Sequence, residues 1–490
     1  MRKYIYIIFL AIVVLFTHTG CDDFFGTKNR EGVEVDGGLS TTTNVRTALN
    51  GAYYNLYYYK FCGNYAVSIG DIASDLTYFT FQGGHFTSIY SYNITDEDSY
   101  MLDIWEYGYK VADNATRIIE AYDNIYAEQT PTDQVDLDVM VAEAYGLRAL
   151  AYLYMSNVFC LPYKVEEGGV NNGEELGLVI LEKPVGVNDK VSRSTIAKTY
   201  EAMLSDLDKS LTYFTKVNKD RGFEYINPSA VHALKARIYL YMEDYTNAIT
   251  EANTALAAQK GKIITDADAY KAMYTSLATA DGETILNIHV DAANNLSANS
   301  PGTLWTKYYH MPSVKYGEYL DPLDIRQVLM ERDDKNLSTG GKFKGVTDNP
   351  AVSSQRLVGM PEMYLIIAEA SLKKSAINIS DAQKALLEVA KRNPDIKTVS
   401  DLPSTKNDLI KFVEDERVRE LIQEGHRFQD CRRWGKKISV YLSNEATGTY
   451  KFNNFDVSKF CYPIPYAETS TGAGVEQNPN WSTTLPTLPK

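Results

Sequence analysis

The sequence predicts a mainly α-helical protein in which helix pairs similar to tetratricopeptide repeats carry a loop-rich ligand-binding part, with little β-structure. Apolar residues recur three and four positions apart through much of the 490-residue chain, which is the spacing of helices with one buried face. Residues 228–258 alternate small and aromatic side chains in the pattern of a helix-pair unit of about 34 residues. Residues 63–100 and 265–355 lack this periodicity and are rich in Gly, Asn, Ser and aromatic residues, so they are predicted to be loops.

The first twenty residues are expected to lie outside the fold. A positively charged start precedes an apolar run, Tyr4 to Phe16, that is too short to span a bilayer, so residues 1–20 are interpreted as a secretory signal peptide. The sequence HTGC that ends at Cys21 is similar to a bacterial lipobox with cleavage before the cysteine. We therefore expect acyl chains such as palmitate on Cys21, and a flexible tether over residues 21–40.

Residues 41–490 are predicted to form one domain built mainly from helices. The first helix has a plausible N-cap at Thr43, and Val45, Leu49 and Leu56 line one of its faces. The segment with the cleanest amphipathic stripe runs from Ile196 to Phe214. The predicted helical regions are about 43–60, 103–160, 196–260 and 361–434.

Aromatic residues in the two loop segments are the candidates for ligand binding. The chain has 37 Tyr, 17 Phe and 4 Trp, and an exposed ring beside amides or carboxylates suits a sugar, which has flat apolar faces and many hydroxyls. Core packing is the alternative for each ring. Asp75 is a further possible polar partner. The candidate ligand-binding residues are Tyr78, Phe79, Phe81, Tyr90, Asn294, Asn295, Trp305, Tyr308, Tyr309 and Tyr316.

Motifs for catalysis, metals and cofactors do not appear in the sequence. The six His residues form no H-x-x-x-H pair, and there is no G-x-S-x-G, P-loop or G-x-G-x-x-G fingerprint. We therefore predict no catalytic residue, metal or cofactor, and a protein that is not an enzyme. Two carboxylates placed for glycoside hydrolysis leave no sequence signature, so that alternative stays open. The net charge of −14 argues against binding to nucleic acid.

A dense group of charged residues follows the helix predicted from Leu409. One interpretation pairs His426 with a carboxylate for acid/base chemistry, and the other treats the whole group as an ion-pair network that fixes the end of a helix. We favour the structural interpretation, because nothing nearby identifies a nucleophile or a metal. The residues of this structural motif are Arg417, Glu420, Glu424, His426, Arg427, Asp430, Arg433 and Trp434.

The same stretch carries a family resemblance. The run ER-x-REL-x-x-EGHR-x-x-D-x-RRWGK, residues 416–436, resembles the C-terminal signature of the SusD/RagB family of Bacteroidetes outer-membrane nutrient-binding lipoproteins. The segments VRTALNGAYYNLY (45–57), CYPIPYAE (461–468) and EQNPNW (476–481) are also similar to landmarks of this family. The resemblance therefore covers nearly all of the chain after the predicted signal peptide.

The resemblance implies a lipid-anchored protein on the outer membrane, facing the cell exterior. Its implied partners are an oligosaccharide ligand and a SusC-like TonB-dependent transporter, to which it would deliver the sugar without changing it. Two alternatives stay open. A RagB-like relative would bind peptides with the same architecture, and a tetratricopeptide-like scaffold would use its helices to bind another protein.

Cys62, Cys160, Cys431 and Cys461 have no close metal-like spacing. They allow three disulfide pairings, and separate buried thiols are an equally open alternative.

Overall fold

The computed structural model describes residues 38–79, 84–166, 173–186, 188–279, 282–306, 310–312, 316, 318–330, 341–441 and 450–486. Within these ranges helices dominate, and the strands form three small antiparallel pairs. The prediction of a mainly α-helical protein with little β-structure is therefore confirmed. Residues 1–20, Cys21 and most of the predicted tether lie outside the described residues. In the part that is described, none of the helices is both long enough and apolar enough to cross a bilayer.

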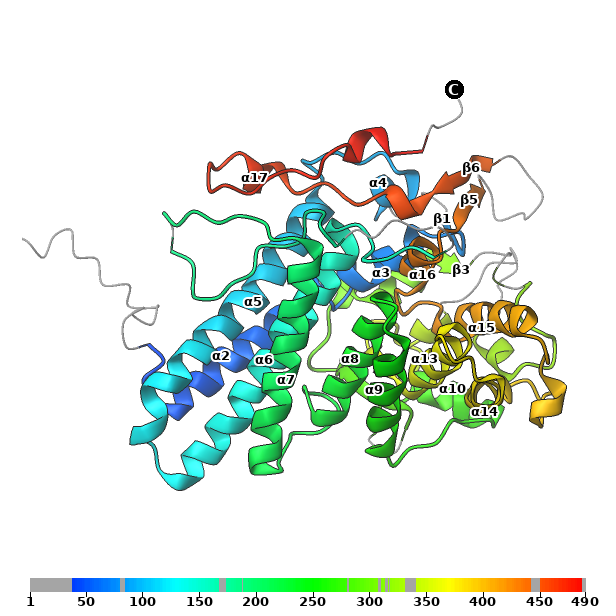
Figure 1. Cartoon of the computed structure of the whole chain (residues 1–490), viewed down its shortest axis with the longest axis horizontal. Helices are drawn as coiled ribbons and strands as arrows, with labels where there is room; N and C mark the ends of the chain where they lie inside the picture. Colours follow the sequence, from blue (N-terminus) through cyan, green and yellow to red (C-terminus); the bar gives the residue numbers. More distant parts are fainter. Residues whose placement is uncertain are drawn as a thin grey trace, which may run out of the picture.

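Four long helices lie side by side in the N-terminal half (Figure 1). They are α2 (Thr42–Tyr57), α5 (Ser99–Ile125), α6 (Pro131–Phe159) and α7 (Ile196–Val217). Helix α6 packs between α5 and α7, and almost all of its side chains from Leu137 onward are buried, as expected for a helix that is apolar on every side. Each helix begins after a residue whose side chain accepts a hydrogen bond from a backbone N–H of the first turn: Thr41, Asp98, Thr130 and Thr195.

Helix pairs form most of the C-terminal half. The predicted repeat over 228–258 is the antiparallel pair α8 (Pro228–Tyr241) and α9 (Tyr245–Ala257). Three fully buried alanines of α9, Ala248, Ala252 and Ala255, form a stripe of small side chains that lets neighbouring helices approach closely. The remaining helices of this half are α10 (Ala267–Thr275), α13 (Met360–Lys373), α14 (Ile379–Ala390) and α15 (Lys406–Leu421).

Short elements connect the long helices. The short helices are α3 (Tyr65–Ile72), α4 (Thr87–Ser91), α11 (Pro301–Thr306), α16 (Arg427–Arg433) and α17 (Tyr466–Thr469). The 3₁₀ turns are Tyr126–Glu128, Ser297–Asn299, Ile325–Leu329, Gly341–Phe343, Val399–Asp401, Val457–Lys459 and Trp481–Thr483.

The three antiparallel strand pairs join segments that are mostly far apart in the sequence. They are β1 (Thr77–Phe79) with β3 (His310–Pro312), β2 (Thr284–Ile288) with β4 (Gln355–Gly359), and β5 (Lys437–Tyr441) with β6 (Tyr450–Asp456). Strand β1 belongs to the first predicted loop segment and β3 to the second, so their pairing brings the two segments together.

The charged residues after the start of α15 form a buried network of ion pairs. Arg417 Nε lies 2.7 Å from Asp430 Oδ2, and Arg433 Nη2 lies 2.7 Å from Oε2 of Glu369 on α13. Trp434 donates its indole N–H to Glu369 at 2.9 Å. Of the eight residues in the structural motif, all but Arg427 are buried, and the network joins α13, α15 and α16.

Cations from the second loop segment complete this network. Arg326 Nη1 lies 2.7 Å from Glu416 Oε1 and 3.2 Å from Glu420 Oε2. Lys342 Nζ lies 2.7 Å from Glu424 Oε1. Carboxylates of α15 and of the turn after it therefore hold Arg326 and Lys342 against the helical core.

His426 lies within this network and is buried. Burial lowers its pKa to about 4, and its Nδ1 atom is 4.0 Å from Glu362 Oε1. The imidazole is therefore neutral at pH 7, and it is enclosed among structural ion pairs, which does not favour the acid/base interpretation.

The turn that follows α15 packs directly against α3. Gly425 has a positive φ of 81°, and its N–H donates to Asp71 Oδ2 at 2.7 Å. Burial raises the pKa of Asp71 to about 7. A Cβ atom on Gly70 would overlap the carbonyl group of Gly425, so only glycine allows the two backbones to approach this closely.

The four cysteines of the folded part are buried, and their thiols are free. Burial raises the pKa of both Cys431 and Cys461 to about 12, so these thiols are protonated at neutral pH. The sequence left disulfides and separate buried thiols as alternatives, and the structure shows separate buried thiols.

The contact between Gly70 and Gly425 gives a test of the fold. We expect Gly70→Ala to lower the free energy of unfolding by about 2 kcal/mol or more, because the added methyl group meets backbone that cannot move aside. Urea denaturation measures the change. Gly51→Ala is the matched control: Gly51 lies inside α2, and the nearest atom to its added Cβ would be Asn114 Nδ2 at 3.8 Å. The control is expected to stabilise the protein by about 0.5–1 kcal/mol. Equal effects of the two substitutions would contradict the proposed packing.

Candidate functional site

Three of the predicted ligand-binding rings are buried in the core. Tyr90, Trp305 and Tyr316 are each at most 2 % exposed, and the Tyr316 hydroxyl donates to the backbone oxygen of Arg419 at 3.0 Å. The prediction that these rings face a ligand was wrong, because large apolar rings in irregular segments have packed into the core beneath the loops. Asp75 is also buried, and its carboxylate pairs with Arg427 at 2.9 Å.

The other predicted residues have different placements. Tyr78 and Phe79 lie in β1, where their backbones pair with those of Met311 and His310. Asn295 is half-buried and shapes its own loop, since its side chain donates to Ala292 O at 3.0 Å and accepts from the Ser297 N–H at 3.0 Å. Phe81, Tyr308 and Tyr309 lie outside the described residues.

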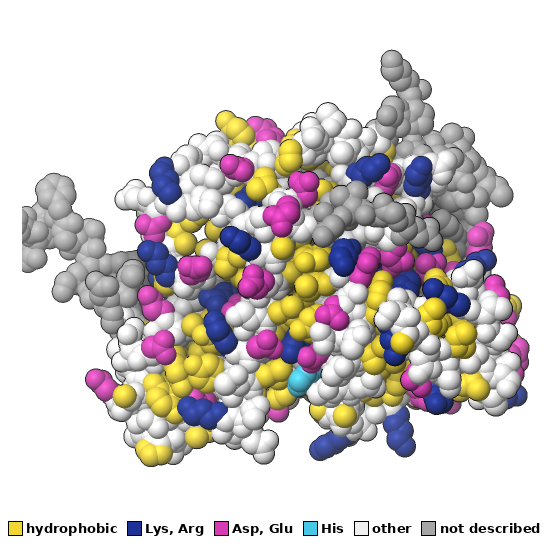
Figure 2. Space-filling view, in the orientation of Figure 1, with side chains coloured by type: hydrophobic (Ala, Val, Ile, Leu, Met, Phe, Trp, Pro, Cys, Tyr) yellow, Lys and Arg dark blue, Asp and Glu magenta, His cyan; other side chains and the backbone are white. Residues whose placement is uncertain are grey.

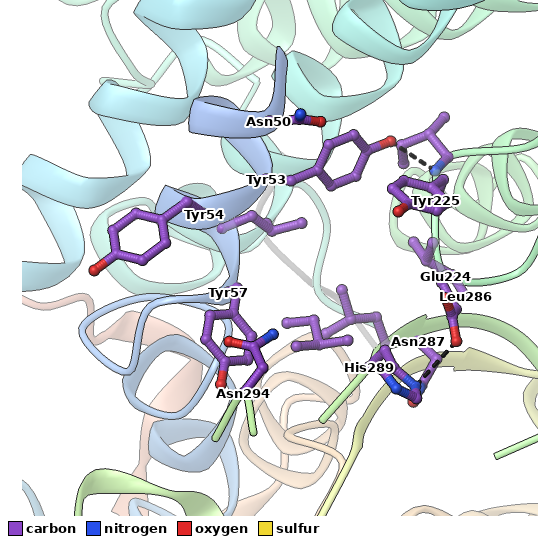
Figure 3. Close-up of a pocket in the computed structure, with 14 residues that line it drawn as sticks. Asn50, Tyr53, Tyr54, Tyr57, Glu224, Tyr225, Leu286, Asn287, His289 and Asn294 are labelled. Atoms are coloured by element: carbon purple, nitrogen blue, oxygen red, sulfur yellow. Dashed lines mark hydrogen bonds and ion pairs between the residues drawn. The ribbon is translucent and has the colours of Figure 1, made fainter. Parts of the chain in front are cut away.

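Asn294 lines a pocket with a volume of about 300 Å³ (Figure 3). The pocket lies between the C-terminal half of α2, residues 224–226, strand β2 and the loop that follows β2. Asn294 is the only one of the predicted ligand-binding residues among those that line it. The lining residues are Asn50, Tyr53, Tyr54, Leu56, Tyr57, Glu224, Tyr225, Ile226, Leu286, Asn287, Ile288, His289, Asn294 and Leu357.

Helix α2 contributes the aromatic wall of this pocket. Asn50, Tyr54 and Tyr57 are spaced four and three residues apart, so they share one face of the helix. Leu49 and Leu56 belong to the buried stripe that packs into the core. The sequence signal that could have revealed this wall is the run of aromatic residues that continues beyond the core stripe of the first predicted helix.

One part of the wall is held firmly in place. The Tyr53 hydroxyl donates to Glu143 Oε2 at 2.7 Å and accepts from the Ile226 N–H at 2.9 Å. Its ring meets the Tyr225 ring edge-on, with centroids 5.2 Å apart. Burial, followed by the nearby Glu143 carboxylate, raises the pKa of Tyr53 well above its usual range.

Two hydrogen-bond donors that line the pocket have no partner among the described residues. The Tyr57 hydroxyl and Asn287 Nδ2 are both buried and unpaired, and the Asn287 side chain comes from β2. Burial, and after it the charge of Asp291, raises the pKa of Tyr57 to about 12, so the hydroxyl keeps its proton at neutral pH. An unpaired buried polar group costs about 1–3 kcal/mol, so a ligand oxygen that reached either donor would recover part of that cost.

A charged pair forms part of the pocket's edge. His289 Nδ1 lies 3.0 Å from Glu224 Oε1 (Figure 3), and His289 Nε2 lies 3.9 Å from Asp291 Oδ2. The three side chains are each between 30 % and 41 % exposed. They therefore present both hydrogen-bond acceptors and a titratable ring to a ligand.

A strip of tyrosines extends from the pocket. We define the tyrosine strip as Tyr54, Tyr58, Tyr59, Tyr65 and Tyr107. Neighbouring ring centroids in it are 4.6 to 5.7 Å apart, and the rings of Tyr58 and Tyr107 are nearly parallel. Tyr54 belongs to both pocket and strip and is 58 % exposed. The other four tyrosines are half-buried, so the strip is a partly exposed aromatic surface next to the pocket.

The pocket and the tyrosine strip together are suited to bind a polar ligand that has flat apolar faces. Aromatic rings pack against such faces, while the unpaired donors and the side-chain amides bind oxygens. Among the residues that the structure describes, no group of three or more His, Cys, Asp or Glu side chains is arranged to hold a metal ion.

The unpaired Tyr57 hydroxyl gives a test of this site. Tyr57→Phe should leave the free energy of unfolding unchanged or raise it by up to about 1 kcal/mol, because it removes a buried donor that has no partner. Tyr53→Phe is the matched control, and it should lower the stability by about 1–2 kcal/mol because it removes the hydrogen bond to Glu143 and leaves the Ile226 N–H without a partner. Chemical denaturation of both variants makes the comparison. A loss of stability in Tyr57→Phe as large as that in Tyr53→Phe would show that the Tyr57 hydroxyl has a structural partner.

Comparison with known proteins identifies relatives over both halves of the chain. Residues 356–481 match the model of the SusD family, and residues 33–240 match a SusD-like model described as "Starch-binding associating with outer membrane". A SusD-like protein of Formosa agariphila is 22 % identical over 408 residues, which are 71 % of this chain and 75 % of the relative.

Solved structures share the whole fold. A SusD superfamily protein from Bacteroides vulgatus is 25 % identical and superposes with a TM-score of 0.78, over 90 % of this chain and 99 % of that one. A SusD-like carbohydrate binding protein from the same species is 18 % identical, with a TM-score of 0.71, over 92 % and 99 % of the two chains. With the two family matches and the signature at residues 416–436, these comparisons show that the chain belongs to the SusD/RagB family.

Proposed function

We propose that this protein binds an oligosaccharide in the pocket and along the tyrosine strip, and that it does not transform the ligand. The observation that carries the proposal is the pair of unpaired buried donors, Tyr57 and Asn287, beside the exposed ring of Tyr54. Family membership supports the same ligand class, since one matching family model is described as starch-binding and one structural relative as carbohydrate-binding.

The geometry matches the two chemical faces of a sugar. The exposed ring of Tyr54 stacks against the C–H face of one sugar unit, and the tyrosine strip receives the units that follow. Inside the pocket, Tyr57 and Asn287 donate to ligand oxygens, while the side-chain oxygens of Asn294 and Glu224 accept from hydroxyls. Each donor gains its first partner when the ligand binds, so the bound state recovers the free energy that the unpaired groups cost the free protein.

We further propose that the protein acts at the outer membrane with a SusC-like TonB-dependent transporter, to which it delivers the sugar. The predicted signal peptide and the lipobox-like sequence that ends at Cys21 support a lipid anchor, and the description of a matching family model names the outer membrane. A lipid anchor facing the cell exterior would keep the binding pocket close to the transporter.

Substitution of the exposed tyrosine tests the function. Tyr54→Ala should weaken binding to the best oligosaccharide found on a glycan array by about tenfold or more, as expected when an aromatic platform worth about 1.4 kcal/mol is lost. Isothermal titration calorimetry measures the affinity. Tyr466→Ala is the matched control, because Tyr466 is similarly exposed, at 53 %, and lies outside the pocket and the strip.

The same titration separates the alternatives. Binding to peptides with no binding to any oligosaccharide would replace the proposal with a RagB-like peptide-binding function. If no sugar or peptide bound and a protein partner bound wild type and Tyr54→Ala equally well, the helices would act as a scaffold instead.

Substitution of the predicted lipidation site tests the location. Cys21→Ser should move the protein out of the outer-membrane fraction and abolish its labelling by palmitate, because a thiol is required for acylation. Affinity purification of the wild-type protein from outer membranes should also recover a TonB-dependent transporter. An unlabelled wild-type chain that purifies without a transporter would disprove the proposed location and partnership, and would leave sugar binding to be judged by the titration.

A further inference from the structure

The formally charged side chains at the pocket are carboxylates, so the formal charge there is negative. Its lining includes one carboxylate, Glu224, and one imidazole, His289, but no Lys or Arg side chain. A second carboxylate, Asp291, lies 3.9 Å from the far nitrogen of His289. A ligand that enters the pocket therefore meets the Glu224 carboxylate, and Asp291, which is not a lining residue, adds a second negative charge beside His289.

The guanidinium that lies over the lining residue Tyr225 is already paired. Arg221 lies 3.7 Å above the ring of Tyr225, and both its Nε and its Nη2 atoms bind the carboxylate of Glu143, the first at 2.7 Å. The Glu143 side chain is fully buried, so leaving it unpaired would be strongly unfavourable. Arg221 is therefore not free to pair with an anionic ligand.

The lysines beside the tyrosine strip are paired as well. Lys60 and Lys110 both lie over the ring of Tyr107, but Lys60 Nζ is 2.9 Å from Asp103 and Lys110 Nζ is 2.5 Å from Glu106. The net formal charge of these four side chains is zero. The face shown in Figure 2 likewise has acidic and basic side chains interspersed, without a broad basic region.

We infer that the pocket selects uncharged sugar units and rejects units that carry a carboxylate or a sulfate group. The inference deepens the proposed function and rests on it. A uronate in the pocket would lose water around its charge, gain no Lys or Arg partner among the residues that the structure describes, and lie near Glu224 and Asp291, and all three effects oppose binding. An uncharged sugar avoids these effects and still supplies acceptors for Tyr57 and Asn287.

Matched pairs of oligosaccharides test the selectivity. Each pair consists of a uronate-containing oligosaccharide and its carboxyl-reduced form, which share linkage and length and differ only in charge. For every pair in which either member binds, we expect the reduced form to bind the wild-type protein at least about tenfold more tightly. Isothermal titration calorimetry or a glycan array supplies the dissociation constants.

Charge-removing variants identify the cause. The double substitution Glu224→Gln, Asp291→Asn should narrow the affinity gap within a pair by about threefold or more, because the repelling carboxylates become amides of the same size. Glu120→Gln is the control, since Glu120 is an exposed carboxylate of α5 outside the pocket, and it should leave the gap unchanged. Thermal melting confirms that each variant is folded.

The outcomes distinguish a failure of the inferred selectivity from a failure of the proposed sugar binding. Equal or tighter binding of the uronate member by the wild-type protein would overturn the selectivity while leaving sugar binding intact. An unchanged gap in the double variant would also overturn the inference, because the two carboxylates would not be its cause. A wild-type protein that binds no sugar in any pair, nor on the array, defeats the proposed function itself.

Discussion

The fold depends on the pairing of buried charges around α15. Glu416 and Glu420 are almost inaccessible to solvent, and a carboxylate in such a place is tolerated only when cations and hydrogen bonds replace the lost water. Arg326 and Arg392 supply those cations from two separate segments that both precede α15 in the sequence. The requirement for pairing fixes where these segments lie, and it gives a long loop-rich segment a defined position on a helical core.

This network extends to the binding pocket. Arg392 binds both Glu420 and Glu283, with Arg392 Nη2 2.6 Å from Glu283 Oε1. Glu283 immediately precedes β2, and its backbone oxygen accepts from the Met360 N–H at the start of α13. Asn287, whose amide is unpaired in the pocket, lies four residues further along the same strand. A charged core and an amide that lines the pocket are thus joined by one short element, which keeps the pocket preformed.

Predictions from the sequence were more accurate for the helices than for the candidate site. The spacing of apolar residues predicted the helical class because a helix that buries one face must repeat every three to four residues. The charges near His426 were also interpreted as structural, since their spacing allowed ion pairs within a helix and beyond it.

The composition of a loop does not determine which way an aromatic ring points. For that reason Trp305 and Tyr316 were predicted to lie at the surface although they lie in the core. Tyr57 and Asn287 are 230 residues apart, and their shared lack of a partner appears only when the chain is folded. The aromatic run at the end of α2 and the candidate residue Asn294 were the local signs of the site.

The two faces of helix α2 differ: one packs into the core, and the other is exposed beside the pocket. Leu49 and Leu56 point into the core, whereas Asn50 and Tyr54 are exposed and contribute little to it. Substitutions at exposed positions away from structural contacts usually change stability by less than about 0.5 kcal/mol. Substitutions on the outward side of α2 can therefore change which ligand fits the pocket while the scaffold stays intact.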